Sequence, residues 1–362
     1  MMKTTIHLLL LLWFALPCLA QDKGWIKEWN ETLAAATKEG KVVVMGSADP
    51  VLRQELPAKF QARFGIPLEY LGGRGGDNFA KLRLERQAGV YTTDAVMAGM
   101  SNMVDYYNEK VIDALRPILI LPDAVDSSKW KKGKLWFMDP EEKYILRLYN
   151  YTSGGLIFVN TQHAKPEEFK SVRDLLQPRW RGKISVYDPT VSGTGEIDAA
   201  RFYMRFGEEF VRKLYVDQKP VISRNKRQLA DWLAHGTYPL SLGLENEAAL
   251  RMKEEGLPVD VLSLPDSPAT LSAGNGLVAL ISKAAHPNAA RLFVNWIASK
   301  EGLEVLGRAR QKPTTRSDIN ESYASPWEVP KPGVGYFDTY DWEFTITMRD
   351  KLSGLLKELL KR

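Results

Sequence analysis

Two residues with hydroxyl side chains and a glycine lie between a predicted strand and a predicted helix in the second half of the chain. Ser192, Gly193 and Thr194 come shortly after Asp188-Pro189, at the point where that strand ends. Backbone N–H groups at a helix start are unpaired, and the helix dipole favours negative charge there. Two hydroxyls and a glycine that allows close approach therefore suit an oxyanion or a carboxylate. Ordinary N-capping by Ser or Thr is the alternative interpretation.

Other predicted strand ends supply side chains that could meet the same ligand. Ligands of open parallel sheets lie beyond the carboxyl ends of the strands, where loops meet helix starts. Arg74 would add positive charge for an anion, although an arginine on a solvated loop is the alternative. Besides the three residues above, the predicted ligand-binding residues are Ser47, Arg74, Gly75, Gly99, Ser101, Tyr151, Ser153, Arg224 and Glu245.

Sequence patterns typical of enzymes are missing. The chain has no GxSxG, HExxH or P-loop motif, and Gly72–Gly76 is no dinucleotide loop because Asn78 replaces the last glycine. Cys18 is the single cysteine, so no cysteine pair could hold a metal. We therefore expect no catalytic residue, no bound metal and no cofactor. An exported hydrolase or lyase that uses Glu245 and Glu247 is the less favoured alternative.

The first 20 residues are typical of a cleaved signal peptide. Lys3 precedes the apolar run Ile6–Leu16, and small residues stand at the end of the segment. The run is shorter than the roughly 20 residues that cross a bilayer. We expect export and cleavage at the end of residues 1–20. Lipid anchoring through Cys18 is an alternative that Pro17 disfavours.

Composition and charge limit the partners of the chain. Its 362 residues are 44% hydrophobic and 26% charged, which is typical of globular proteins and enough for about two domains. There are 49 basic and 44 acidic residues, and the net charge of +5 is spread without a basic block. We expect no nucleic-acid or membrane partner, and only a mild preference for anions.

Predicted strands and helices alternate along the chain, and they are the elements that must position these side chains. This order predicts an α/β fold with mostly parallel sheets and right-handed crossovers. Asp77 and Ser101 are expected to cap helices. The expected strands are 42–45, 66–71, 93–97, 183–187, 221–223 and 238–244, with apolar strand segments within 269–281. The expected helices are 50–64, 77–87, 195–206, 226–234, 287–299, 300–310 and an amphipathic 348–360 that packs on a lobe.

Several motifs, taken in order, resemble the periplasmic solute-binding proteins of ABC importers. The similarity is to the branch that holds ferric-ion, thiamine and phosphosugar or phosphonate binders. The order and spacing of the motifs support the resemblance, which covers nearly all of residues 40–320. The motifs are TDAVM at 93–97, GLIFVN at 155–160, VRDLL at 172–176, WRGKI at 180–184, AHPNAA at 285–290, SKEG at 299–302 and PTTRSD at 313–318.

The resemblance implies a two-lobed, type II Venus-flytrap fold with discontinuous lobes. We place the chain crossings near 133–140 and 262–269. Lobe one is then 21–136 plus 270–325, lobe two is 137–269, and 326–362 is a C-terminal tail. A ligand held between the lobes would stabilise the closed form.

The function implied by the resemblance is capture of a small solute in the periplasm and its delivery to an ABC permease with its ATPase. We expect a monomer and an anionic, organic or phosphorylated solute. A sensor-feeding binding protein would look the same. The ferric binders of this branch use adjacent tyrosines in the second lobe, and 242–246 has none. Tyr106 and Tyr107 lie in a helical stretch, whereas Tyr149 and Tyr151 could share a strand face. Iron therefore stays the alternative cargo.

Overall fold

The structure is a computed structural model that describes residues 18–153, 155–191, 193–244, 246–262, 264–267 and 269–361. Residues 1–17 of the predicted signal peptide lie outside these ranges, and so do Ser192 and Glu245 of the predicted site. In the part of the chain that is described, no helix combines the length and apolarity needed to cross a membrane.

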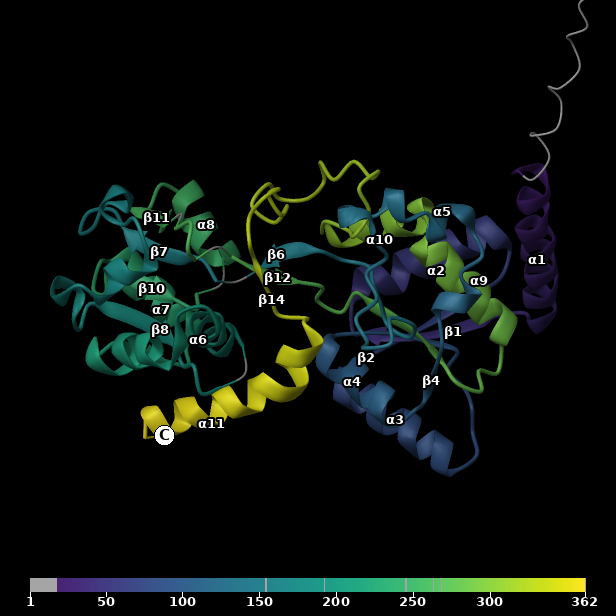
Figure 1. Cartoon of the computed structure of the whole chain (residues 1–362), viewed down its shortest axis with the longest axis horizontal. Coiled ribbons are helices and arrows are strands. Elements are labelled where there is room, and N and C mark those ends of the chain that lie inside the picture. Colours follow the sequence, from purple (N-terminus) through teal and green to yellow (C-terminus); the bar gives the residue numbers. More distant parts are fainter. Residues whose placement is uncertain are drawn as a thin grey trace, which may run out of the picture.

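The first lobe is built on a six-stranded sheet (Figure 1). Its strands are β1 (Val42–Ser47), β2 (Leu68–Gly73), β3 (Ala95–Ala98), β4 (Ile112–Asp113), β5 (Leu146–Arg147) and β13 (Leu277–Ile281). The strand order is β2-β1-β3-β13-β4, and β5 also pairs with β13. β1 is parallel to β2 and β3, but β13 is antiparallel to β3, β4 and β5. The sheet is therefore mixed rather than mostly parallel, because β13 enters from the far end of the chain.

One long helix of the first lobe begins directly after a residue that caps it. In the helix that follows β1, Asp49 accepts hydrogen bonds from the N–H groups of Val51 and Leu52, and Gly65 ends the helix with φ 71°. Its Phe60 is buried against Phe293 and Trp296. The helices are α1 (Cys18–Glu39), α2 (Pro50–Phe64), α3 (Gly75–Gln87), α4 (Met100–Asn108), α5 (Pro122–Val125), α9 (Pro287–Ala298) and α10 (Lys300–Arg310).

The second lobe has a five-stranded mixed sheet of order β11-β7-β10-β8-β9, with its own apolar core. Its strands are β7 (Ile157–Asn160), β8 (Ile184–Tyr187), β9 (Val221–Ser223), β10 (Leu240–Leu242) and β11 (Val259–Leu262), and its helices are α6 (Thr194–Arg212), α7 (Lys226–Ala234) and α8 (Asn246–Glu254). Parallel pairing joins β8 to β9 and β10, whereas β7 is antiparallel to both of its neighbours.

A three-stranded sheet connects the lobes (Figure 1). It consists of β6 (Tyr151–Ser153), β12 (Thr270–Ser272) and β14 (Phe337–Asp338), with β12 in the middle. β6 carries the chain out of the first lobe and β12 carries it back. The chain thus leaves the first lobe after Tyr149, later than the 133–140 expected from the sequence, because β5 still pairs within the first sheet and Tyr149 is buried in the first-lobe core. The return lies between β11 and β12.

The C-terminal segment, which we define as residues 337–359, continues from β14 into α11 (Arg349–Leu359) through a π-helical turn at Phe344–Met348. Leu352 and Leu356 of α11 are buried in the core of the second lobe, together with Phe344. The predicted amphipathic helix therefore packs on a lobe, as expected. Outside these elements, one further π-helical turn lies at Lys213–Asp217, and short 3-10 turns lie at Arg116–Ile118, Ser127–Lys129, Lys131–Gly133, Pro166–Glu168, Val172–Leu176 and Pro178–Trp180.

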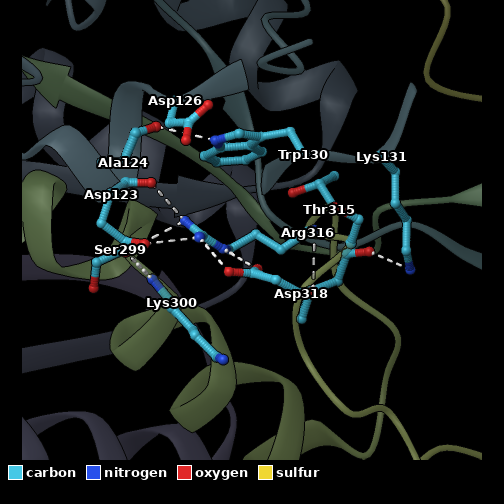
Figure 2. A network of polar contacts seen from close by, with 12 residues as sticks. Asp123, Ala124, Asp126, Trp130, Lys131, Ser299, Lys300, Thr315, Arg316 and Asp318 are labelled. Atoms are coloured by element: carbon cyan, nitrogen blue, oxygen red, sulfur yellow. Dashed lines mark hydrogen bonds and ion pairs between the residues drawn. The ribbon is translucent and has the colours of Figure 1, made fainter. Parts of the chain in front are cut away.

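A buried arginine fixes the last motif of the first lobe to the helices beside it (Figure 2). Arg316 is fully buried and its guanidinium donates to both carboxylate oxygens of Asp318, at 2.8 and 2.9 Å. It also donates to the Asp123 carboxylate at 2.9 Å and to the Asp123 backbone carbonyl. The Asp123 carboxylate in turn accepts the N–H of Lys300, at the start of α10. These charged hydrogen bonds join residues 313–318 to α5 and α10.

Candidate functional site

The start of α6 sits directly on the ends of two strands of the second lobe. Gly193 precedes the helix with φ 133°, a backbone conformation that favours glycine. A Cβ added to Gly195 would lie 2.4 Å from the Tyr187 carbonyl oxygen and 2.7 Å from that of Asp188. One added to Gly243 would lie 2.8 Å from the Tyr187 Cβ. Glycines thus let the helix N-terminus reach the carboxyl ends of β8 and β10, as the sequence predicted for residues 193–194.

Two of the predicted side chains at this place already have protein partners. The Thr194 hydroxyl donates to the Gly243 carbonyl at 2.5 Å. Its proton is therefore already used in a hydrogen bond, while its oxygen can still accept one. Arg224 donates through Nε to the fully buried Asp188 carboxylate at 2.9 Å, although 65% of the arginine side chain is exposed. The buried carboxylate therefore holds the arginine at the strand end, and its remaining N–H groups reach solvent.

In the first lobe, the glycine-rich turn and its helix differ from expectation. β2 extends through Gly73 and α3 already begins at Gly75, so Asp77 lies inside the helix and is not its cap. Arg74 occupies the N-cap position and is exposed, without a side-chain capping bond. The tight turn is possible because Gly73 lies against Asn78, where a Cβ would meet the amide oxygen at 2.2 Å.

The start of α4 also differs from expectation. Gly99 is its N-cap and Ser101 is the second helical residue, so Ser101 does not cap the helix. A Cβ on Gly99 would lie 3.3 Å from the Gly274 carbonyl oxygen and 3.8 Å from the Tyr340 hydroxyl. The start of α4 therefore faces the loop after β12 and the C-terminal segment.

The hinge strands contribute Tyr151 and Ser153. The Ser272 hydroxyl donates to the Tyr151 hydroxyl at 3.4 Å, and Gly274 packs against the same phenol. Tyr340 donates to the Gly274 carbonyl, and burial, with a smaller contribution from nearby Tyr151, raises the pKa of Tyr340 to about 12. The carbonyl of Ser153 accepts from the Thr270 hydroxyl, which makes this serine part of the hinge pairing.

One arginine of the C-terminal segment connects the two helix starts. Arg349 donates through Nη1 to the Ser101 hydroxyl of α4 at 3.0 Å, and through Nη2 to the Glu196 carboxylate of α6 at 2.9 Å. The Glu196 side chain is 9% exposed, and its hydrogen bonds raise the pKa of Arg349. The structure thus brings Ser101 of the first lobe close to the first turn of α6 in the second lobe. Sequence reasoning missed Arg349, Glu196 and Tyr340.

Ser47 has its described contacts within the first lobe, whereas Gly75, next to Arg74, lies against the Asn102 side chain at the start of α4. The carbonyl of Ser47 accepts from the Tyr70 hydroxyl and from the N–H of Asp49, both in the first lobe. A separate cavity of about 230 Å³ lies between α6 and the residues around Tyr336, and none of the predicted ligand residues that the structure describes lines it. Its lining includes Arg201, Phe202, Arg205, Phe206, Tyr336 and Phe337.

The paired tyrosines considered for iron have different surroundings. Tyr149 and Tyr151 do lie on one side of the chain, with ring centroids 6.4 Å apart. Tyr149 is buried, its hydroxyl donates to the Leu306 carbonyl at 3.0 Å, and burial raises its pKa. Among the described residues, no group of three or more His, Cys, Asp or Glu side chains is placed to hold a metal ion.

Comparisons with known proteins agree with this architecture. Residues 144–309 match the family described as bacterial extracellular solute-binding protein. An uncharacterized protein of Haemophilus influenzae is 26% identical over 293 residues, which cover 75% of this chain and 76% of that protein.

Two solved structures illustrate the similarity in fold. The periplasmic binding protein AfuA from Actinobacillus pleuropneumoniae, with fructose-6-phosphate bound, has a TM-score of 0.56 at 19% identity, over 89% of this chain and 99% of that one. Iron-bound HitA from Pseudomonas aeruginosa has a TM-score of 0.59 at 15% identity, over 88% of this chain and 99% of that one. The resemblance inferred from the motifs is therefore confirmed for residues 144–309, which match the solute-binding family, and the chain has the two-lobed fold of periplasmic binding proteins.

Proposed function

We propose that this protein captures a small organic or phosphorylated anion between its lobes in the periplasm and delivers it to an ABC permease with its ATPase. Capture would use the starts of α4 and α6, the hinge tyrosine Tyr151 and the exposed part of Arg224. Hinge motion about β6 and β12 would then enclose the solute. The match of residues 144–309 to the solute-binding family supports the permease and the periplasmic location, and the chemistry of these residues supports the class of solute.

The observation that carries the proposal is that helix starts from both lobes lie on either side of one guanidinium. Ser101 and the first turn of α6 are joined through Arg349, at hydrogen-bond distances. Helix N-termini present unpaired N–H groups and a positive dipole end, which favour phosphate and carboxylate. Glu196 offsets part of this positive charge, so an anion that also offers hydroxyl donors would suit the site best.

The class of cargo is chosen by side-chain chemistry, because the similar structures differ in what they hold. AfuA was solved with a sugar phosphate and HitA with iron. A ferric site built on Tyr149 and Tyr151 would need the Tyr149 phenolate. Its buried hydroxyl instead donates to a backbone carbonyl, and burial raises its pKa, which opposes ionisation. An organic anion needs no such change.

A thermal-shift screen of the purified protein tests the proposal. The panel holds phosphorylated sugars, each beside its unphosphorylated parent, together with phosphonates, small carboxylates, thiamine and ferric citrate. A ligand at 100 times its Kd stabilises the native state by about 2.7 kcal/mol. We expect a rise in Tm with one class of anion and no rise with the matched neutral parent.

Two outcomes would contradict the proposal. Stabilisation by ferric citrate but not by citrate alone would assign iron as the cargo. Turnover of a panel compound, followed by mass spectrometry, without a stable complex would favour an exported enzyme. As a site control, Ser101→Ala should weaken binding of the stabilising anion, whereas Lys59→Gln, on an exposed face of α2, should not.

A further inference from the structure

The C-terminal segment contacts the hinge, the first lobe and the second lobe in succession (Figure 1). It begins at β14, which pairs in parallel with β12 through Phe337 and Asp338. The Asp338 carboxylate accepts from Nη1 of Arg147 at 2.6 Å, and this arginine is fully buried. The segment is therefore anchored on the strands about which the lobes would rotate.

The segment passes from one lobe to the other within three residues. Trp342 packs on the first lobe, where its ring lies 5.0 Å from that of Tyr107. Phe344 is buried in the core of the second lobe. The exposed Glu343 between them is the point of crossing. The apolar anchors on either side thus each belong to a single lobe and can stay in place when the lobes move.

Arg349 differs from these anchors because it contacts both lobes. It starts α11, whose Leu352 and Leu356 are buried in the second lobe, and its guanidinium is held there by Glu196. The same guanidinium reaches back to Ser101 on the first lobe. Six residues beyond the crossing, this hydrogen bond has its donor on the second lobe and its acceptor on the first. Relative rotation of the lobes would therefore change the Nη1–Oγ distance while the contact with Glu196 could persist.

We propose that Arg349 is an inter-lobe tie: a charged hydrogen bond, carried by the second lobe and positioned by Glu196, that holds the first lobe in the observed arrangement through Ser101. Movement of the lobes relative to one another requires this bond to break. The tie is a property of the chain without cargo, so it does not depend on the proposed solute. Hydrogen bonds with a charged donor are the stronger ones in proteins. The Arg349 side chain is 30% exposed, so solvent weakens the bond.

Distance measurements between the lobes in the absence of solute test the tie. Spin labels are attached at Lys59→Cys on α2 and Glu254→Cys on α8, in a Cys18→Ser background, because both positions are exposed and lie on different lobes. Double electron–electron resonance then gives the distribution of inter-lobe distances. Ser101→Ala removes only the acceptor on the first lobe, Arg349→Gln removes the charge, and Lys351→Gln is the matched control on the same helix.

We expect Ser101→Ala and Arg349→Gln to increase the population of other inter-lobe distances several-fold, and Lys351→Gln to match the parent distribution. Ser101→Ala leaves the contact between Arg349 and Glu196 in place, so a change in that variant is not caused by release of α11. Unchanged distributions in both Ser101→Ala and Arg349→Gln would overturn the proposal. Failure of the solute screen would leave this result unaffected.

Discussion

Replacing Arg316 by methionine should destabilise the first lobe strongly. The side chain is fully buried and forms hydrogen bonds with Asp123 and Asp318 (Figure 2). Methionine fills much of the same space but offers no donor. The change would leave two carboxylates and the Asp123 backbone carbonyl without the guanidinium.

The magnitude follows from how exposed the two carboxylates are. Removing one partner of a fully buried ion pair costs about 3–5 kcal/mol. The side chains of Asp123 and Asp318 keep 44% and 26% exposure, so water can solvate them once the arginine is gone. We therefore expect a loss near the lower limit, about 3 kcal/mol in the free energy of unfolding.

Urea denaturation followed by tryptophan fluorescence measures this loss. Urea is uncharged and does not screen the ion pair, and the Trp130 ring lies 5.8 Å from the Arg316 guanidinium, so it reports on this region. Asp318→Asn and the double variant complete a cycle that isolates the coupling between the two residues. A loss below about 1 kcal/mol, the usual limit for a surface ion pair, would refute the reasoning.

Three further predictions concern pH and glycines. The Arg316 guanidinium lowers the pKa of Asp318 below its ordinary 3.8. The ion pair therefore stabilises the fold above about pH 4, and this stabilisation is lost as the pH falls through the lowered pKa. The acid unfolding of Asp318→Asn should lack this pH-dependent loss of stability. Gly195→Ala should cost about 1–3 kcal/mol in urea denaturation, because its Cβ would press on the Tyr187 and Asp188 carbonyls; unchanged stability would contradict this packing. Gly354→Ala, whose Cβ meets no atom within 4 Å on helix α11, should raise Tm, since alanine favours a helix by about 1 kcal/mol over glycine.

Local periodicity was enough to predict many elements, whereas the two predicted caps, Asp77 and Ser101, are not caps in the structure. The expected bounds of α2, α7 and α10 agree with the structure, because Asp49, Asn225 and Ser299 each cap the helix that follows. The glycine run 72–76 misled the prediction, since glycine is compatible with both a turn and the end of β2. Strand direction was also missed: β13 has the same apolar pattern in either orientation, and only its long-range pairing decides it.

The candidate site was harder to predict because part of it comes from residues without a local signal. Strand ends and glycines indicated Gly99, Ser101 and Thr194, since the carboxyl edge of a sheet is visible in the order of elements. Arg349 opens an amphipathic helix after a tail rich in aromatics, and nothing in its neighbours indicates a contact with Ser101. Such a contact depends on how the tail crosses the lobes, which the hydrophobic pattern does not encode.

The position of β13 has a consequence for how the protein is made. This strand lies between β3 and β4, yet in the chain it comes after the entire second lobe. During synthesis from the N-terminus, β1 to β4 emerge early but cannot complete their sheet. The strands of the second-lobe sheet, β7 to β11, form one continuous stretch of chain and need no later strand, although α11 completes the core around them. We therefore expect the sheet whose first strands are made earliest to be completed after the sheet of the second lobe, with its unpaired strand edges exposed meanwhile to chaperones and proteases.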